Sequence, residues 1–537
     1  MIQRLTWTDW MFASALLVSF IPILTCDFIV TSDGPCHFYN SQILVSWLIE
    51  GQGEFYKPFL QLNQNLEPNW ITNALQVPLL KIVPSVAAER IFFALYLLGF
   101  AFGLRKVILL VNPQAGFLVI IGIVFAWNLV LMKGFTNNAW SIVIWFWLIA
   151  SWIKLLRSNS VGQYLIVALL FFLLYLAHPI GLIFGLIASL CLLLGWGVFH
   201  YRLKGWRAFI GFIMNRSAVL MLCSFAPAIL FISFYLRHPW SSEANAFHFD
   251  HIFMDLLRMP SLINLSFAEQ PLVYLFSILM NVLLVIAIVG RIRKRELKRF
   301  DGMLILFLSS LFIIFNPPSS VAGGLEVSFR LGLFVHLSAL FWMATHDYSK
   351  FVQVAASVWA MLIITGMMYL RWPIHRQASA YASEIMEVSD SIDTRSTLLV
   401  LNYDWSGKTP EGQQISDRAW LFTHVDCYLG ISKDLAISDN YEANFWYFPL
   451  IERWETNMYF QTDKDKVNFD NRPPRADFNS YKRRTGQYID YVLMLSYRDE
   501  FAAHPYTQEI FNQLDTDYIQ ISRSEHGRAI LYKRQLY

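Results

Sequence analysis

An acid, a proline and a histidine stand close together directly after the first long apolar run of the chain, in TSDGPCHFYN at residues 31–40. Proline is favoured in the first turn of a helix, so the pattern predicts that a helix begins near Pro35. Asp33 then lies at the entrance of that helix, and His37 is expected to lie near it. Two interpretations are open. Asp33 either caps the helix at the membrane surface, or it faces a cavity where partial desolvation raises its pKa and makes it a better general base.

The composition places these residues in a membrane protein. Of the 537 residues, 56% are hydrophobic and only 15% are charged, and the mean hydropathy is +0.42. These values predict a polytopic membrane protein rather than a soluble enzyme. The net charge of +3 is small, and no basic run is interleaved with aromatic residues. The sequence therefore excludes a nucleic-acid partner and predicts membrane lipids as the surroundings.

Apolar windows long enough to cross a bilayer predict about eleven spans. They lie near residues 10–30, 87–110, 115–131, 137–156, 161–177, 180–198, 216–236, 271–290, 301–315, 330–346 and 351–371. We interpret the first as a retained helix rather than a cleaved signal peptide, because no small-residue cleavage site follows it. A further apolar segment at residues 70–83 is too short to span and is predicted to be a juxtamembrane or half-inserted helix.

Positively charged residues set the expected orientation of the chain. If the N-terminus is inside, the inner loops hold most of the lysines and arginines, including RIRKRELKR at residues 291–299, and the outer loops hold few. This orientation places Asp33 and the C-terminal part of the chain outside. An arrangement with one more span and the N-terminus outside fits the later loops equally well.

The composition changes after about residue 373, which predicts a transmembrane domain at 1–373 and an outer soluble α/β domain at 374–537. TLLVLNYD (397–404) and YVLMLS (491–496) predict buried strands, and YIQISRSEHGRAILYKR predicts a hairpin that turns at His526 and Gly527. The expected fold class is therefore an α-helical polytopic membrane bundle with juxtamembrane helices, followed by a soluble α/β domain. This domain has no glycine-rich phosphate loop, GxSxG or HExxH, so no chemistry is assigned to it.

The layout of the chain resembles the GT-C superfamily of membrane glycosyltransferases. The shared features are one apolar helix, an outer loop that opens with an acidic residue, interfacial helices, and a many-helix bundle that ends in an outer soluble domain. The segments PNWITNALQVPLLKIVPSVAAERIFFALYLLGF (68–100) and GFTNNAWSIVI (134–144) carry the residue-level resemblance. It is similar above all to the branch of protein O-mannosyltransferases and lipid A aminoarabinose transferases.

The resemblance implies a transferase that takes a sugar from a polyprenyl phosphate or pyrophosphate donor and passes it to a protein, lipid or glycan acceptor on the outer face. In that family an acidic residue of the first outer loop acts as base or metal ligand, and Asp33 matches it. Many relatives have an acidic pair there, whereas Gly34 follows Asp33. We therefore expect a general base and no cofactor, with a divalent cation as the alternative. An outer soluble domain and the lack of eukaryotic sorting signals in the sequence favour a location in a bacterial inner membrane.

A carrier phosphate that leaves gains negative charge in the transition state, so cations must hold it. Guanidinium groups bind phosphate with two hydrogen bonds, which favours arginines over lysines. For each candidate the structural alternative is an arginine that reaches to the interface, a solvated loop residue or a helix stop. The substrate-binding candidates are His37, Lys57, Arg90, Lys133, His178, Arg330 and Glu326, with Arg258 as a further outer cation.

Two other classes of function compete with the transferase. A transporter is disfavoured because the predicted spans are nearly free of ionisable residues, which transporters use inside the membrane. The second competitor is a scaffold of the cell envelope that has the transferase layout but no catalysis. Replacing Asp33 by asparagine separates catalyst from scaffold, because only a catalyst loses activity while it stays folded.

Overall fold

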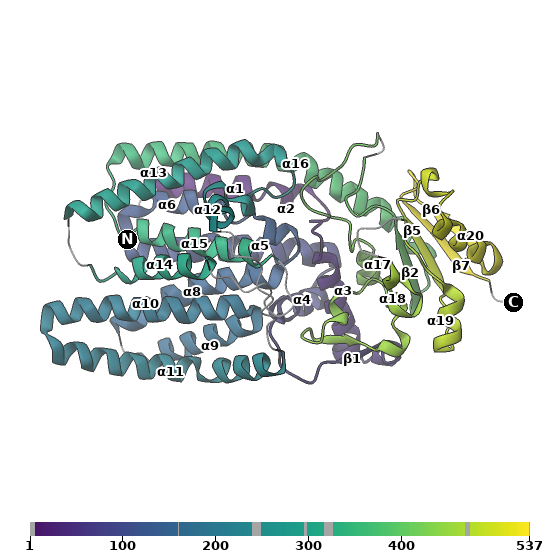
Figure 1. The fold of residues 1–537 in the computed structure, drawn as a ribbon, viewed down its shortest axis with the longest axis horizontal. Coiled ribbons are helices and arrows are strands. Elements are labelled where there is room, and N and C mark those ends of the chain that lie inside the picture. The colour runs from purple at the N-terminus through teal and green to yellow at the C-terminus, as the bar shows by residue number, and fades with distance from the viewer. Residues whose placement is uncertain are drawn as a thin grey trace.

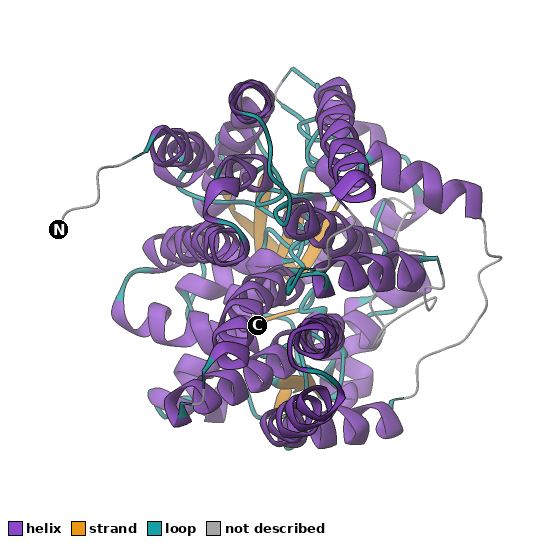
Figure 2. Ribbon diagram, turned by 90° about the vertical axis from the view of Figure 1, so that its left-hand side faces the viewer, coloured by secondary structure: helices purple, strands orange, loops and turns teal. Residues whose placement is uncertain are grey.

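Long helices form one end of the molecule and a small sheet with short helices forms the other (Figure 1). The structure is a computed structural model, and it describes residues 6–158, 160–238, 249–294, 298–315, 326–409, 411–467 and 473–535. Seen along the long axis, the bundle helices appear end-on with the strands behind them (Figure 2).

Every predicted span coincides with a helix or with a pair of helices. Among the described residues, six helices are long and apolar enough to cross a membrane, and α9, α14 and α15 are shorter apolar helices. The bundle contains α1 (Trp7–Ser19), α2 (Ile21–Thr25), α5 (Ser85–Val111), α6 (Phe117–Ile123), α7 (Leu129–Met132), α8 (Thr136–Arg157), α9 (Val161–Ala177), α10 (Pro179–Lys204), α11 (Trp206–Arg237), α12 (Phe249–Arg258), α13 (Gln270–Lys294), α14 (Gly302–Ile314), α15 (Val327–Met343) and α16 (Lys350–Met386).

Two predicted spans, at 10–30 and 115–131, are interrupted. The first is divided between α1 and α2, where Pro22 occupies the first turn of the second helix and has no N–H to donate. The second is divided between α6 and α7, where the side chain of Asn128 caps α7 by accepting a hydrogen bond from the N–H of Leu131 at 3.0 Å. Hydropathy is high throughout each segment, so it did not predict that the helix ends inside it.

The predicted juxtamembrane segment is the helix α4 (Ile71–Ile82). At 1.5 Å per residue its 12 residues extend about 18 Å, which is less than the hydrocarbon core of a bilayer. Its polar face packs inward. Asn73 donates to the hydroxyl of Ser41 at 3.0 Å, and that hydroxyl donates to Gln76 at 2.9 Å, so α4 is fastened to α3 (Gly34–Leu44).

A five-stranded sheet with the order β3-β2-β5-β7-β6 organises the C-terminal part. Strands β3, β2 and β5 are parallel, and β7 and β6 continue the sheet as an antiparallel hairpin. All residues of β2 and β5 are buried, as expected of strands covered on both faces. This confirms the predicted α/β class and hairpin. The elements are β2 (Ser396–Asn402), α17 (Cys427–Ser432), β3 (Leu435–Ile437), α18 (Met458–Gln461), α19 (Phe478–Thr485), β5 (Tyr491–Leu495), α20 (Pro505–Asp517), β6 (Tyr518–Arg523) and β7 (Ala529–Arg534).

The first outer loop and the C-terminal part are joined through hydrogen bonds. Strand β1 (Leu60–Leu62) pairs antiparallel with β4 (Leu450–Glu452). The hydroxyl of Tyr39 on α3 donates to the carbonyl of Leu435 at 2.6 Å, and Figure 1 shows α3 and α4 between the bundle and the sheet. Helix α16 also passes the predicted domain boundary after residue 373 without a break. The loop that carries Asp33 is therefore covered by the C-terminal part.

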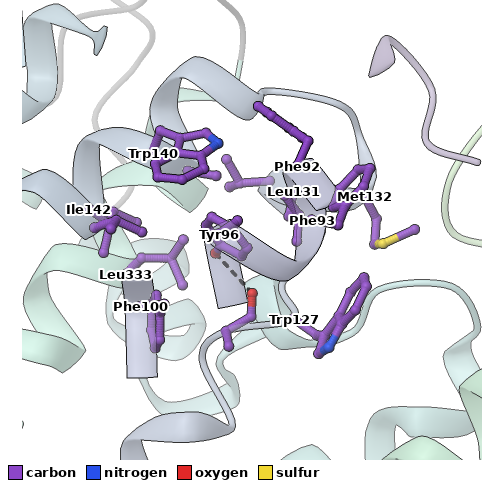
Figure 3. Packing of buried hydrophobic residues seen from close by; sticks show 14 of the residues in the cluster. Phe92, Phe93, Tyr96, Phe100, Trp127, Leu131, Met132, Trp140, Ile142 and Leu333 are labelled. Carbon is purple, nitrogen blue, oxygen red and sulfur yellow. Dashed lines mark hydrogen bonds between the residues drawn. The ribbon is translucent and has the colours of Figure 1, made fainter. Parts of the chain in front are cut away.

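An aromatic core supports the segment that contacts this loop (Figure 3). Phe92 and Phe93 of α5 pack near Trp140 and Trp127 respectively, with ring centroids 5.7 and 6.5 Å apart. The chain is not helical between α6 and α7, so its buried carbonyls need donors. The hydroxyl of Tyr96 donates to the carbonyl of Ala126 at 2.9 Å. The core thus fixes the backbone that leads into α7.

Candidate active site

The backbone around Asp33 is held by the end of α7. The N–H of Ser32 donates to the carbonyl of Met132 at 3.1 Å, and the N–H of Asp33 donates to the carbonyl of Lys133 at 3.3 Å. Asp33 occupies the N-cap position of α3, but its side chain makes no capping hydrogen bond. Thr31 accepts the N–H of Gly34 instead, at 3.1 Å. The structure therefore leaves the Asp33 carboxylate unused by the helix terminus.

Gly134 packs directly against this backbone. Its φ is +83°, in the region that favours glycine, and a Cβ there would lie 2.5 Å from the nitrogen of Asp33 and 2.6 Å from that of Gly34. Both the conformation and the close approach require glycine. The segment GFTNNAWSIVI thus begins with the residue that positions the Asp33 loop.

Replacing Gly134 by alanine is expected to lower the thermal unfolding temperature of the purified protein, because strain of about 1–2 kcal/mol adds to the clash with the Asp33 backbone. Gly211→Ala is the control, since nothing lies within 4 Å of a Cβ at that position in α11 and its φ is unstrained. Equal unfolding temperatures for Gly134→Ala and the wild type would contradict the packing described here.

The Asp33 carboxylate faces the C-terminal part of the chain. It accepts a hydrogen bond from the side chain of Tyr441 and lies among the charges of Arg330, Lys133 and Glu326. Burial raises the pKa of Asp33 from its ordinary value to about 7. The hydrogen bond and the two cations oppose this shift, and the Glu326 carboxylate adds to it. Asp33 is thus half ionised near neutral pH, as suits a general base.

Arg330 is buried on α15, close to Asp33. It donates from Nη1 to Nε2 of His178 at 3.0 Å, and its guanidinium lies over the ring of Phe135 at 4.1 Å. Its Nε has no hydrogen-bond partner among the described residues. A buried N–H without an acceptor is costly, and an anion would satisfy it. Three of the predicted residues thus lie near one another, since Arg330 contacts His178 and lies within electrostatic range of Asp33.

Lys133 and Glu326 form an ion pair near the carboxylate of Asp33. Both side chains are about one quarter exposed, so the pair lies where the site meets solvent. Glu326 neutralises the charge of Lys133. Of the two cations near Asp33, Lys133 and Arg330, it is therefore Arg330 whose charge is available to an anion. This agrees with the preference for arginine expected from phosphate geometry.

His37 joins the loop to the C-terminal part. Its Nε2 donates to the carbonyl of Gly134 at 2.9 Å, and its Nδ1 is in close contact with a carboxylate oxygen of Glu442. Burial lowers the pKa of His37 to about 3, so the ring is neutral. His37 acts on the backbone next to Asp33 rather than on its carboxylate.

Two predicted candidates lie elsewhere. Arg90 donates from Nε to the carbonyl of Ile23 and from Nη2 to that of Leu24, both at 3.0 Å, and so closes the end of α2. Lys57 forms an exposed pair with Glu54. Both arrangements agree with the structural alternatives for these residues.

Sequence reasoning missed the contribution of the C-terminal part. Tyr441 and Glu442 contact Asp33 and His37, and Tyr447 lies within electrostatic range of both Asp33 and Arg330. The signal available was the run YEANFWYF at 441–448, in which aromatic residues surround an acid. Without a known catalytic motif, that run gave no reason to place it beside the first outer loop.

The groups around Asp33 do not suit a metal ion. Among the described ranges, no three His, Cys, Asp or Glu side chains are grouped so that they could hold one. The nearby carboxylate of Glu326 is already paired with Lys133. The buried charged group close to Asp33 is a cation, Arg330. Divalent cations need several oxygen ligands, and this set offers two carboxylates and two competing cations.

Comparison with solved structures identifies the fold. ArnT from Cupriavidus metallidurans aligns over 98% of this chain and 97% of its own, at 11% sequence identity and a TM-score of 0.51 in the apo state. The complex of the same protein with undecaprenyl phosphate gives a TM-score of 0.53. The chain has the fold of ArnT.

The ArnT-like fold confirms the predicted architecture of a helical bundle followed by an α/β part, and together with the apolar helices it makes the chain a multi-pass membrane protein. The apo oligosaccharyltransferase of Archaeoglobus fulgidus aligns less closely, at 9% identity over 92% of this chain and 70% of that one, with a TM-score of 0.44. No protein-family model and no curated protein sequence matches the chain.

Proposed function

We propose that this protein is a membrane glycosyltransferase that moves a sugar from a polyprenyl phosphate or pyrophosphate carrier to a hydroxyl of a protein, lipid or glycan acceptor. The observation that carries the proposal is that Asp33, a carboxylate that titrates near neutral pH, lies within electrostatic range of the buried guanidinium of Arg330, where the helices meet the C-terminal part. The ArnT-like fold supports the choice of donor, because ArnT has been solved with undecaprenyl phosphate bound.

In the proposed reaction Asp33 takes the proton of the acceptor hydroxyl as its oxygen attacks the anomeric carbon. The bond between that carbon and the carrier phosphate oxygen breaks, and the phosphate leaves with the electron pair. Arg330 stabilises the charge that develops there, and Tyr441 orients the Asp33 carboxylate. The residues of this chain supply both base and cation, so we propose that no metal is required.

We further propose that the protein lies in a bacterial inner membrane with its N-terminus inside and Asp33 outside. A lipid-linked donor stays in the bilayer, so its site must open to lipid as well as to the acceptor. The distribution of lysines and arginines supports this orientation.

Release of free carrier tests the proposal. The purified wild type is incubated with a panel of radiolabelled polyprenyl-phosphate and pyrophosphate sugars, with membrane extract as acceptor. Release from at least one donor together with label in the acceptor fraction is the expected result. A folded protein that releases no carrier from any donor would favour a non-catalytic scaffold.

The pH profile gives an independent prediction. Only the ionised form of Asp33 accepts a proton, so kcat/KM should rise with pH up to about 7 and then level off. With a single titrating group, activity at pH 5 should be about a hundredfold below the plateau. A profile that stays flat from pH 5 to pH 8 would remove Asp33 as the base.

A further inference from the structure

A cavity of about 280 Å³ opens in the C-terminal part at the carboxyl ends of β2 and β3. Asn402, the last residue of β2, lines it, as do Ser438 and Asp439, which follow β3. In open α/β sheets ligands bind outside the carboxyl ends of parallel strands. The volume is near the lower end of the usual range for small-molecule sites, roughly 300 Å³, so the cavity suits one ring rather than a longer chain.

The walls of this cavity combine flat aromatic faces with polar groups. Five of the lining residues are aromatic, namely Trp405, Tyr441, Phe445, Tyr459 and Phe460. Aromatic rings pack against the apolar C–H face of a ligand, while hydroxyl, amide and charged groups bind its edges. A ring that carries hydroxyl groups presents both kinds of surface.

Three charged groups line the cavity, Asp439, Lys464 and Arg475, and the Nε of Arg475 is a buried donor without a hydrogen-bond partner among the described residues. Lys464 donates to the carboxylate of Asp439 at 2.6 Å and to the carbonyl of Val400 at 2.6 Å, and its side chain is 8% exposed. The ammonium charge is thus already matched, and a phosphate placed here would meet the carboxylate of Asp439. A neutral hydroxylated ring can instead donate to that carboxylate.

His424 supplies a buried nitrogen, Nδ1, that is available to a ligand. The residue is 7% exposed and lines the cavity, and its ring stacks on Tyr441 with centroids 4.6 Å apart. Its Nδ1 makes no hydrogen bond within the described part of the chain. Burial lowers the pKa of His424 to about 4, so the ring is neutral. A hydroxyl can satisfy this nitrogen whichever tautomer is present, because it both donates and accepts.

Tyr441 connects the cavity with the base. Its ring forms part of the cavity wall, and its hydroxyl donates to the carboxylate of Asp33. One side chain therefore separates a ligand in the cavity from Asp33. The phosphate of a lipid-linked donor is assigned instead to Arg330, which lies on the bundle helix α15.

We propose that this cavity binds one sugar ring of the acceptor and directs an acceptor hydroxyl past Tyr441 to Asp33. The assignment of the ring to the acceptor rests on the proposed function. The assignment of the cavity to a sugar stands on its own contacts and can be tested without any donor.

Direct binding is measured on the full-length protein by saturation-transfer NMR with glucose, galactose, mannose, glucosamine and N-acetylglucosamine, and with inorganic phosphate by ³¹P line broadening. Tyr459→Ala removes one aromatic wall, and His424→Phe keeps the stacked ring but removes its nitrogens. Each should weaken binding of the preferred sugar about tenfold. Tyr488→Ala is the control, because Tyr488 is a 41% exposed aromatic residue of the same C-terminal part and does not line the cavity.

Sugar binding that falls in both cavity variants and persists in the control supports the proposal. No binding of any sugar, equal binding by all variants, or binding of phosphate alone would overturn it. If the wild type releases carrier, the same variants should raise the KM for acceptor and leave acceptor-independent hydrolysis of the donor unchanged; loss of both would assign the cavity to the donor sugar and overturn the acceptor assignment. Sugar binding without carrier release from any donor would refute the proposed function and keep the sugar site.

Discussion

Asp33→Asn is expected to lower kcat/KM for carrier release by about 10²–10⁴-fold while the protein stays folded. The amide has the shape of the carboxylate, and its oxygen can still accept the hydrogen bond from Tyr441. It cannot take the proton of the acceptor hydroxyl. Because burial disfavours the ionised form of Asp33, removing that charge should leave the unfolding temperature unchanged or raise it at pH 8.

The sign of the stability change follows from the pKa. In the unfolded chain Asp33 ionises near the ordinary pKa of an aspartate, 3.8, whereas in the folded protein its pKa is about 7. Ionised Asp33 therefore destabilises the folded state as pH rises through this interval, and the asparagine variant is free of that cost. Activity and stability should thus move in opposite directions.

Asp27→Asn provides the matched control for this change. Asp27 is exposed in the same outer loop, and the contact recorded there is from its backbone N–H to Ser379. Its variant should keep the activity of the wild type. If Asp33→Asn stays within about threefold of the wild type, general-base catalysis by Asp33 is wrong.

Local patterns predicted the elements of this fold well. The hydropathy of one continuous window predicts a membrane helix. A short apolar run between polar residues predicts a buried strand such as β2. The stops inside the segments 10–30 and 115–131 depend on Pro22 and Asn128, single residues that hydropathy averages away. Hydropathy therefore predicted the positions of the helices more reliably than their continuity.

The candidate site was only half predictable, for a different reason. Asp33 stood out because an acid and a proline follow a membrane helix, and Arg330 because an arginine is costly beside a span. Tyr441 and Glu442 complete the site from a segment far along the chain. Contacts between distant segments leave no period or spacing in one sequence. The role of the C-terminal part became visible only through its pairing with the first outer loop, as in β1 with β4.

Arg330→Gln is expected to lower kcat/KM for carrier release by about 10²–10³-fold, because the leaving phosphate loses the cation that stabilises its charge. Arg330→Lys should lie between this variant and the wild type, since lysine keeps the charge but not the two parallel hydrogen bonds of a guanidinium. The contact of Nη1 with His178 orients the guanidinium, and Nε remains available to donate to the phosphate. A lysine at this position has no equivalent of this second donor.

Inhibition by undecaprenyl phosphate separates a phosphate-binding role from a structural one. If Arg330 binds the carrier phosphate, the inhibition constant should rise in Arg330→Gln by a factor similar to the loss of activity, and less in Arg330→Lys. Arg258→Gln, which removes an exposed arginine at the end of α12, should change neither quantity. A purely structural arginine would lower the unfolding temperature and the amount of active enzyme, while the remaining enzyme would be inhibited as strongly as the wild type. That outcome would move the phosphate site away from Arg330 and leave the buried guanidinium to serve only His178 and Phe135.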